Sequence, residues 1–155
     1  LSAQFQGLRS PGNYNNQIGL PKSLLELTAE HEFAVFELGA SRVGEIRALA
    51  AIAEPEIGII TAIGQAHWET FGGVEGIIQG KGELLEALPA TGFAVLPGDD
   101  PVTRGMAPRA KCRSVFVGTG PENDLVAKEV VASPEEVRFI VDGVPFRVAL
   151  PGPTL

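Results

Sequence analysis

Short, continuous apolar runs alternate along this chain with segments of helical periodicity, and this alternation limits the folds that it can adopt. The runs lie at 33–36, 57–63, 93–96 and 114–117. The apolar residues of 46–53 stand at i, i+3, i+4 and i+7, which predicts an amphipathic helix, and 74–88 carries a similar stripe that ends at Pro89. Continuous apolar strands separated by helices are typical of a parallel sheet covered on both faces. We therefore predict an α/β fold, with a mostly parallel sheet flanked by helices.

The pattern changes near residue 120, after which strand-like segments follow one another without helices. These segments are 125–132, 137–141 and 144–150. Asp142 and Gly143 form an Asp-Gly pair that favours a two-residue type I′ hairpin, and Pro145 is typical of an edge strand. We expect one domain, with an α/β part over 1–120 and a small antiparallel β extension over 121–150.

Composition excludes several classes of protein. The 155 residues suit one domain, and 12 Lys and Arg against 19 Asp and Glu give a net charge of −7. An acidic chain without a basic cluster is not expected to bind nucleic acid. The single cysteine, Cys112, excludes a disulfide framework within the chain and a cysteine-built zinc site. No apolar run approaches the roughly 20 residues of a transmembrane helix. We expect a cytoplasmic protein that does not insert into membranes.

Two polar residues follow the first two predicted strands. Glu37 closes the run 33–36, and His67 lies four residues after the run 57–63. Ligands of open α/β sheets collect beyond the carboxyl ends of the strands, so these side chains are expected to converge there. A carboxylate with a neutral imidazole can hold a divalent cation beside a phosphate, and magnesium or manganese suits such a site. The alternatives are a solvated or Arg42-paired Glu37 and an ordinary loop histidine.

Lys81 continues the apolar stripe of the predicted helix 74–88. A lysine on an inward face is unfavourable unless it is paired, neutral or modified. Because helical side chains lean toward the N-terminus of their helix, Lys81 should reach back toward the loop that holds His67. Gly80 and Gly82 flank Lys81, and each glycine costs about 1 kcal/mol of helix propensity relative to alanine. A helix that tolerates two such residues is expected to need a close backbone approach there. The alternative is a lysine at the margin of the stripe whose ammonium reaches solvent.

An asparagine-rich segment near the start of the chain is a candidate for binding a polar ligand. Asn13, Asn15 and Asn16 lie within ten residues that also contain two glycines. Amide groups offer donors and acceptors to a ligand, and glycine permits its close approach. The alternative is an ordinary turn before a helix that begins at Pro21.

A pair of aspartates follows the third predicted strand. Asp99 and Asp100 come directly after Gly98 and can accept hydrogen bonds from the sugar hydroxyls of a nucleotide. A capping role before a helix that begins at Pro101 is the alternative.

Four segments stand out by their order and spacing. They are GNYNNQIGLP (12–21), ELGASRVGEI (37–46), AHWETFGG (66–73) and KGELLEAL (81–88). In this order the chain resembles the central domain of the Mur ligases, the ATP-dependent amide-bond ligases of bacterial cell-wall synthesis, over nearly its whole length. The first two segments look most like the family member that joins D-alanyl-D-alanine to UDP-N-acetylmuramoyl-tripeptide.

The resemblance implies a P-loop NTPase-like fold and a reaction through an acyl phosphate. ATP would phosphorylate the terminal carboxylate of the UDP-linked muramyl tripeptide, and the amine of D-alanyl-D-alanine would then displace the phosphate. Glu37 and His67 match the magnesium-binding positions of the family. Lys81 matches its carbamylated lysine, which helps to hold a second magnesium ion. Asn15 and Asn16 match a motif near the substrate and the transferring phosphate.

The chain also departs from the family pattern. It contains no GxxxxGK[ST] phosphate loop, and Pro97 stands where the family often has an asparagine that helps to seat the nucleotide. The uridine-binding and C-terminal domains of the family have no counterpart, so we expect a partial central domain that is inactive alone. Two alternatives are another ligase, of the folylpolyglutamate or cyanophycin type, and a non-catalytic module that lost the phosphate loop.

Overall fold

The computed structural model describes residues 4–64 and 68–150, and the strands of these residues form three sheets. The central sheet is parallel and consists, in spatial order, of β3 (Ile57–Ile59), β4 (Phe93–Pro97), β5 (Arg113–Gly118) and β6 (Leu125–Val126). A parallel pair is formed by β1 (Gly7–Arg9) and β2 (Phe33–Val35). The third sheet is antiparallel and contains β7 (Lys128–Ala132), β8 (Glu136–Val141) and β9 (Val144–Ala149). The predicted α/β fold with a C-terminal antiparallel extension is confirmed.

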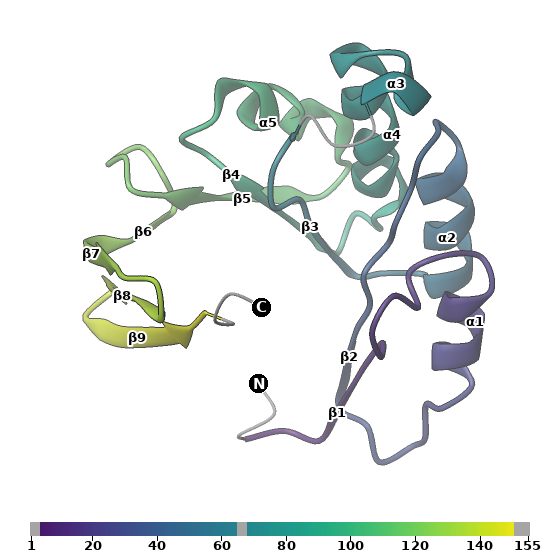
Figure 1. The fold of residues 1–155 in the computed structure, drawn as a ribbon, viewed down its shortest axis with the longest axis horizontal. Coiled ribbons are helices and arrows are strands. Elements are labelled where there is room, and N and C mark those ends of the chain that lie inside the picture. Colours follow the sequence, from purple (N-terminus) through teal and green to yellow (C-terminus); the bar gives the residue numbers. More distant parts are fainter. Residues whose placement is uncertain (1–3, 65–67, 151–155) are drawn as a thin grey trace.

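The helices gather on the outer side of the strands, as Figure 1 shows, and the antiparallel sheet lies at the opposite end of the view from α1 and α2. They are α1 (Gly19–Leu24), α2 (Glu45–Ala53), α3 (Trp68–Phe71), α4 (Val74–Ala87), α5 (Pro101–Gly105) and the 3-10 turn η1 (Ala107–Arg109). The two helices predicted from periodicity are therefore confirmed as α2 and α4. Within the described ranges, no helix has the length and apolar character needed to cross a membrane.

The core forms where α4 meets the central sheet. Leu85 and Leu88 at the end of α4 pack with Ala94 and Leu96 of β4, and each of the four exposes 1% or less of its surface. Gly58 of β3 allows the close approach of the helix, because a Cβ there would lie 3.1 Å from Leu88 Cδ1. The apolar stripe seen in the sequence is thus the surface that fixes α4 on the sheet.

Within the described residues, the helices cover one face of the central sheet, and the other face is more exposed. Ala94 and Leu96 are fully buried, whereas Phe93, on the other face of β4, is 44% exposed. Ile57 and Ile59 of β3 are each 58% exposed. Successive strand residues point to opposite faces, and the helices next to this sheet lie on one side of it (Figure 1). In β3 and β4, therefore, alternate side chains of the apolar runs face the core of the described residues, and the others lie on the more exposed face.

The second predicted strand, 57–63, is shorter than expected, because its neighbour contains a proline. The last ladder bond of β3 runs from Ile60 N–H to the Val95 carbonyl oxygen, at 3.1 Å. In a parallel ladder the following bond would need an N–H from residue 97, which is Pro97. Without this donor the pairing ends, and 61–64 leaves the sheet.

The tail of the chain follows the prediction in part. β6, which we expected in the antiparallel extension, instead pairs parallel with β5, so the antiparallel sheet begins at Lys128. The hairpin prediction is confirmed, since β8 and β9 are joined by Asp142 and Gly143 with φ of 50° and 80°. Pro145 lies in β9, an edge strand as expected.

The one-sided core predicts unequal effects of two truncations in the central sheet. We expect Leu96→Ala to lower the free energy of unfolding by about 2–5 kcal/mol, because it opens a cavity in the core. Ile59→Ala should lower it by less than about 1 kcal/mol, because that side chain is largely exposed. Urea denaturation of the two variants measures both values, and losses of equal size would contradict the one-sided arrangement.

Candidate functional site

A cleft of about 540 Å³ lies between the asparagine-rich segment and the loop that follows β2. Its walls come from 15–18, from 39–41 and from Glu45 and Leu49 of α2. Two of the four segments singled out in the sequence, 12–21 and 37–46, therefore build this cleft together. Polar side chains of Asn15, Asn16 and Ser41 lie in its lining beside apolar ones, which suits a ligand with both polar and apolar groups.

Asn15 and Glu37 are in direct contact beside this cleft. Asn15 Nδ2 donates a hydrogen bond to Glu37 Oε1 at 3.0 Å, and the Gly39 N–H donates to the Asn15 carbonyl oxygen at 2.8 Å. Gly39 permits this approach, since a Cβ there would lie 2.8 Å from Asn15 Cγ. The partner of Glu37 is thus Asn15 rather than Arg42. An exposed carboxylate held by one amide keeps acceptor positions for a cation.

We expected Glu37 and His67 to follow neighbouring strands, but the strands that precede them, β2 and β3, are not paired with each other in the described part of the chain. β2, which precedes Glu37, pairs with β1, whereas β3 pairs with β4. Within 4–64 and 68–150 no ladder joins β2 to β3. Left-handed residues at both ends of α2, Gly44 and Glu54, turn the chain sharply between the two sheets. His67 lies outside the described residues, so its place relative to Glu37 stays a prediction.

Asn16 has a structural role that the sequence left open. Its Oδ1 accepts hydrogen bonds from the N–H groups of Ile18 and Gly19, at 3.0 and 2.9 Å. These bonds satisfy free donors at the start of α1, as an N-cap side chain does. The helix begins at Gly19, two residues before the predicted start at Pro21. Asn13 is exposed, and its binding role stays a prediction.

Lys81 lies half-buried on α4, and its side chain reaches the segment that follows β3. Its predicted approach to the loop that holds His67 stays a prediction, because His67 lies outside the described residues. Its Nζ donates a hydrogen bond to the carbonyl oxygen of Ala62, at 2.6 Å. Burial lowers the pKa of the Lys81 ammonium, because the charged form loses hydration. Lys81 thus contacts the segment that leads to 65–67. At a given pH, a larger fraction of its amine is neutral than in a fully solvated lysine.

The two glycines beside Lys81 each admit a neighbouring side chain. A Cβ on Gly80 would lie 2.5 Å from Phe71 Cε1, and a Cβ on Gly82 would lie 2.0 Å from Arg109 Nη1. The close approach predicted from the sequence is therefore confirmed on both sides of Lys81. These contacts fix the turn of α4 that carries the lysine.

Arg109, the side chain next to Gly82, was not foreseen in the sequence. Its guanidinium donates to the carbonyl oxygens of Ile78 and Gln79, at 2.8 and 3.1 Å, and to Glu86 Oε1 at 2.6 Å. The hydrogen bond from Arg109 holds the pKa of the Glu86 carboxyl below its usual value. The only signal in the sequence was Gly82, whose missing side chain makes room for the guanidinium.

Asp99 and Asp100 both stabilise local structure. Asp99 accepts from the N–H and hydroxyl of Thr119, from Gly120 N–H and from Asn123 Nδ2, at 2.6–3.0 Å. Asp100 caps α5 through a hydrogen bond from Val102 N–H, at 3.0 Å, so its alternative role as a cap is observed. Contacts of these aspartates with a nucleotide stay a prediction.

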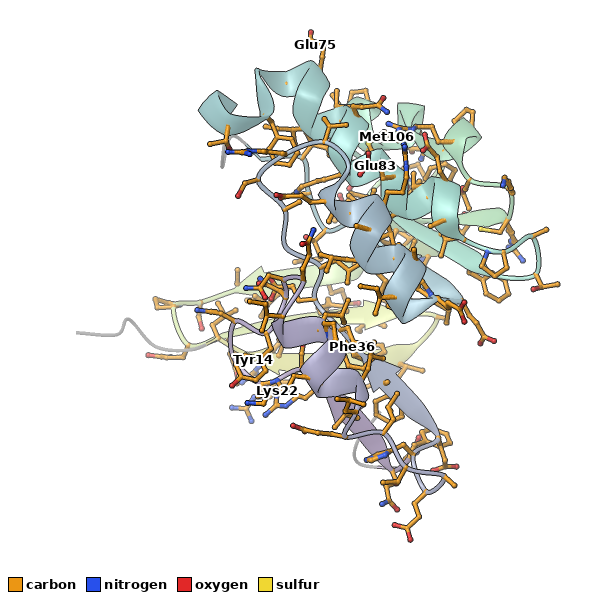
Figure 2. All side chains as sticks on the ribbon, turned by 90° about the vertical axis from the view of Figure 1, so that its right-hand side faces the viewer. Tyr14, Lys22, Phe36, Glu75, Glu83 and Met106 are labelled. Carbon is orange, nitrogen blue, oxygen red and sulfur yellow. The ribbon has the colours of Figure 1, made fainter. Side chains whose placement is uncertain are left out.

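Glu83 is a further residue that sequence analysis missed. It is 1% exposed, and its carboxylate accepts hydrogen bonds from the N–H groups of Gly44 and Arg47 at the start of α2. Figure 2 shows Glu83 directed into the molecule, whereas Glu75 on the same helix points away from it. Glu83 lies off the apolar stripe of α4, so the periodicity that predicted the helix carried no signal for its burial.

The described residues suit magnesium by their chemistry but do not enclose it. No group of three or more His, Cys, Asp or Glu side chains in 4–64 and 68–150 is arranged to hold a metal ion. Magnesium commonly uses one or two protein carboxylates and takes its other oxygens from phosphates and water. The exposed carboxylate of Glu37, with the amide of Asn15 beside it, fits such a partial set.

The hydrogen bonds of Asp99 predict a contribution to stability that depends on pH. They hold the pKa of the Asp99 carboxyl far below its usual value, so the folded state resists protonation. The stabilisation is complete above about pH 4, the ordinary aspartate value, and is lost as the pH falls below it. Asp99→Asn should therefore be less stable than the unchanged chain at pH 7, by a difference that narrows toward pH 3.

Urea denaturation at both pH values measures this difference. Asp100→Asn is the matched control, because asparagine caps a helix as well as aspartate does. A difference for Asp99→Asn that stays constant between pH 7 and pH 3 would contradict the assignment.

Two solved structures that share this arrangement of elements are those of MurF ligases. The chain matches the crystal structure of MurF from Acinetobacter baumannii with a TM-score of 0.85 at 35% identity, covering 98% of this chain and 34% of that one. It also matches MurF ligase from Thermotoga maritima, solved in complex with ADP, with a TM-score of 0.80 at 32% identity, covering 98% of this chain and 36% of that one.

Sequence comparison agrees with the structural one. The UDP-N-acetylmuramoyl-tripeptide–D-alanyl-D-alanine ligase of Bacillus subtilis is 35% identical over 144 residues, which are 93% of this chain and 31% of that protein. The chain thus spans about a third of the length of the relatives it matches. Residues 1–154 match the family model of the Mur ligase middle domain. The cleft, the clamped lysine helix and the parallel sheet described above therefore belong to a member of the Mur ligase family.

Proposed function

We propose that this chain is the middle domain of an ATP-dependent ligase that adds D-alanyl-D-alanine to UDP-N-acetylmuramoyl-tripeptide in peptidoglycan synthesis. The observation that carries the proposal is the 35% identity to a ligase of that name over 93% of the chain. The family model covers 1–154, a range that includes the residues that form the cleft and those that pack around Lys81. ATP, the tripeptide precursor and D-alanyl-D-alanine are the proposed partners, and the cytoplasm is the proposed location.

The proposed reaction has two covalent steps. The terminal carboxylate of the tripeptide attacks the γ-phosphorus of ATP, which forms an acyl phosphate and releases ADP. The amine of D-alanyl-D-alanine then attacks the acyl carbon, and phosphate leaves with the electron pair of the broken C–O bond while the amine loses a proton. Positioning and charge stabilisation dominate the catalysis of phosphoryl transfer, so the protein acts mainly through the groups that hold the reactants.

Glu37 and His67 are proposed to bind one magnesium ion, and of these two only Glu37 lies within the described residues. Lys81, as a carbamate, is proposed to help hold a second magnesium ion. Magnesium, when bound, neutralises the charge of the phosphate oxygens. Asn15 orients the Glu37 carboxylate through its 3.0 Å hydrogen bond and borders the cleft for the substrate. Asn13 and Asn16 are proposed to contact the substrate from the same segment.

Lys81 is proposed to act as a carbamate. Its neutral amine attacks carbon dioxide, the new N–C bond forms, and the nitrogen loses a proton, so that a cation becomes an anion with two oxygen donors. The lowered pKa of the Lys81 ammonium supports this step, because more of the amine is neutral at a given pH. Hard magnesium prefers these oxygens to an amine nitrogen.

Asp99 and Asp100 are proposed to support the binding of the nucleotide. Their carboxylates are engaged within the chain, so they would act by ordering 119–123 and the start of α5. Pro97 supplies no side-chain amide where the family often has one. Backbone groups of this edge are then the proposed contacts for the nucleotide.

The proposal is tested with the full-length protein that contains this chain. Phosphate release should require ATP, the tripeptide precursor and D-alanyl-D-alanine together, and mass spectrometry should find the pentapeptide product. Glutamate or aspartate as the only accepted amine would favour the folylpolyglutamate or cyanophycin type instead. Absence of any ATP turnover would favour a non-catalytic module.

Glu37→Ala in the full-length protein should lower the ligation rate by at least about 100-fold and raise the magnesium concentration needed for half-maximal rate. Folding should change little, because Glu37 is exposed and few packing contacts are lost. Glu26→Ala is the matched control, because Glu26 is an exposed glutamate that does not line the cleft. A near-normal rate for Glu37→Ala at limiting magnesium would contradict the metal-site assignment.

Lys81→Ala should abolish ligation while the protein stays folded, and added short carboxylic acids should restore part of the rate by supplying the missing carboxylate. Activity of the unchanged protein should also fall in carbon-dioxide-free buffer, most strongly below pH 7, where less of the amine is neutral. Product formation with and without acetate measures both effects. Full activity of Lys81→Ala without any acid would contradict the carbamate proposal.

A further inference from the structure

Glu83 links the two parts of the molecule that carry the proposed site. One part contains Asn15 and Glu37 and belongs to the β1–β2 pair, and the other contains Lys81 on α4 and belongs to the central sheet. No strand ladder joins β2 to β3 in the described ranges, where helix contacts connect the two parts. The packing of α2 on α4 is the main such contact.

The Glu83 carboxylate lies in the middle of this helix contact. Gly44 N–H donates to both of its oxygens, at 2.8 and 3.0 Å, and Arg47 N–H donates to Oε2 at 3.1 Å. The Arg47 guanidinium adds an ion pair of 3.4 Å to Oε1. These donors form the N-terminus of α2, where the helix dipole also favours a negative charge. A buried carboxylate with this set of partners holds α2 in one position on α4.

The same contact fixes the loop that forms one wall of the cleft. Gly44 takes a left-handed conformation, with φ of 97°, and ends the loop that begins after Glu37. Within this loop, the N–H groups of Ser41 and Arg42 donate to Glu45 Oε2, at 2.7 and 3.2 Å. The loop is therefore tied to the first turn of α2, and Glu83 ties that turn to α4.

Lys81 lies two residues before Glu83, so the two side chains leave α4 about 200° apart around the helix. Lys81 contacts Ala62 on one side, and Glu83 contacts α2 on the other. We infer that Glu83 is a positioning residue, whose carboxylate sets the separation between the Glu37 side of the site and Lys81. The kinetic part of this inference rests on the proposed function, and the structural part does not.

Glu83→Gln in the full-length protein is the direct test, because it keeps the size of the side chain and removes its charge. We expect amide hydrogen exchange at Gly44 and Arg47 to become at least tenfold faster. We expect kcat to fall on the order of 10- to 100-fold, as a small misplacement of reacting groups does. The KM values for the substrates should change less than threefold, and extra magnesium should restore part of the rate.

Glu75→Gln is the matched control, because Glu75 lies on the same helix and points away from the molecule (Figure 2). It should change neither exchange nor kcat. Glu83→Asp keeps the charge but withdraws the carboxylate by one methylene, and it should give the same pattern as Glu83→Gln. It takes the place of Glu83→Gln if that variant does not fold.

The outcomes separate this inference from the proposed function. Unchanged exchange at Gly44 would overturn the link itself. Faster exchange with an unchanged kcat and magnesium requirement would overturn the positioning role and leave Glu83 a purely structural residue. If the unchanged protein makes no pentapeptide, the proposed function fails, and the exchange experiment still decides whether Glu83 holds α2 on α4.

Discussion

The arrangement of this domain depends on one buried carboxylate, Glu83, at the contact of α2 with α4. Charged side chains are rarely buried without partners, because the loss of hydration is large. Here the partners are backbone N–H groups at the start of α2 and the Arg47 guanidinium. The contact therefore links the cleft to the core within the described chain, where the two sheets share no ladder.

Around Lys81 the same helix is held from two further directions. Phe71 and Arg109 occupy the space that Gly80 and Gly82 leave open, and Arg109 bonds to two carbonyl oxygens of the preceding turn. Glycines normally weaken a helix, yet here they let other side chains brace it. The result is a rigid turn below a half-buried amine, which is the arrangement that a precisely placed functional group requires.

The sequence was informative wherever a local pattern decided the structure. Periodicity predicted α2 and α4, and the Asp-Gly pair predicted the hairpin between β8 and β9. The burial of Glu83 and the place of Arg109 depend on residues more than 30 positions away, and no local pattern encodes them. The parallel pairing of β6 with β5 joins nearby residues, but the strand-like pattern of 125–132 did not show that its first two residues belong to another sheet. An apolar run likewise indicates that a strand can be buried and does not indicate which residues cover it.

The early end of β3 has a consequence for the loop that Lys81 contacts. Pro97 offers no hydrogen to the Ile60 carbonyl, so the chain is released from the sheet two residues before Ala62. Every other amino acid carries the backbone N–H that the next hydrogen bond of this ladder would need. The absent N–H of Pro97 on β4 thus coincides with the point where β3 ends. The segment that begins there supplies the Ala62 carbonyl oxygen that Lys81 contacts.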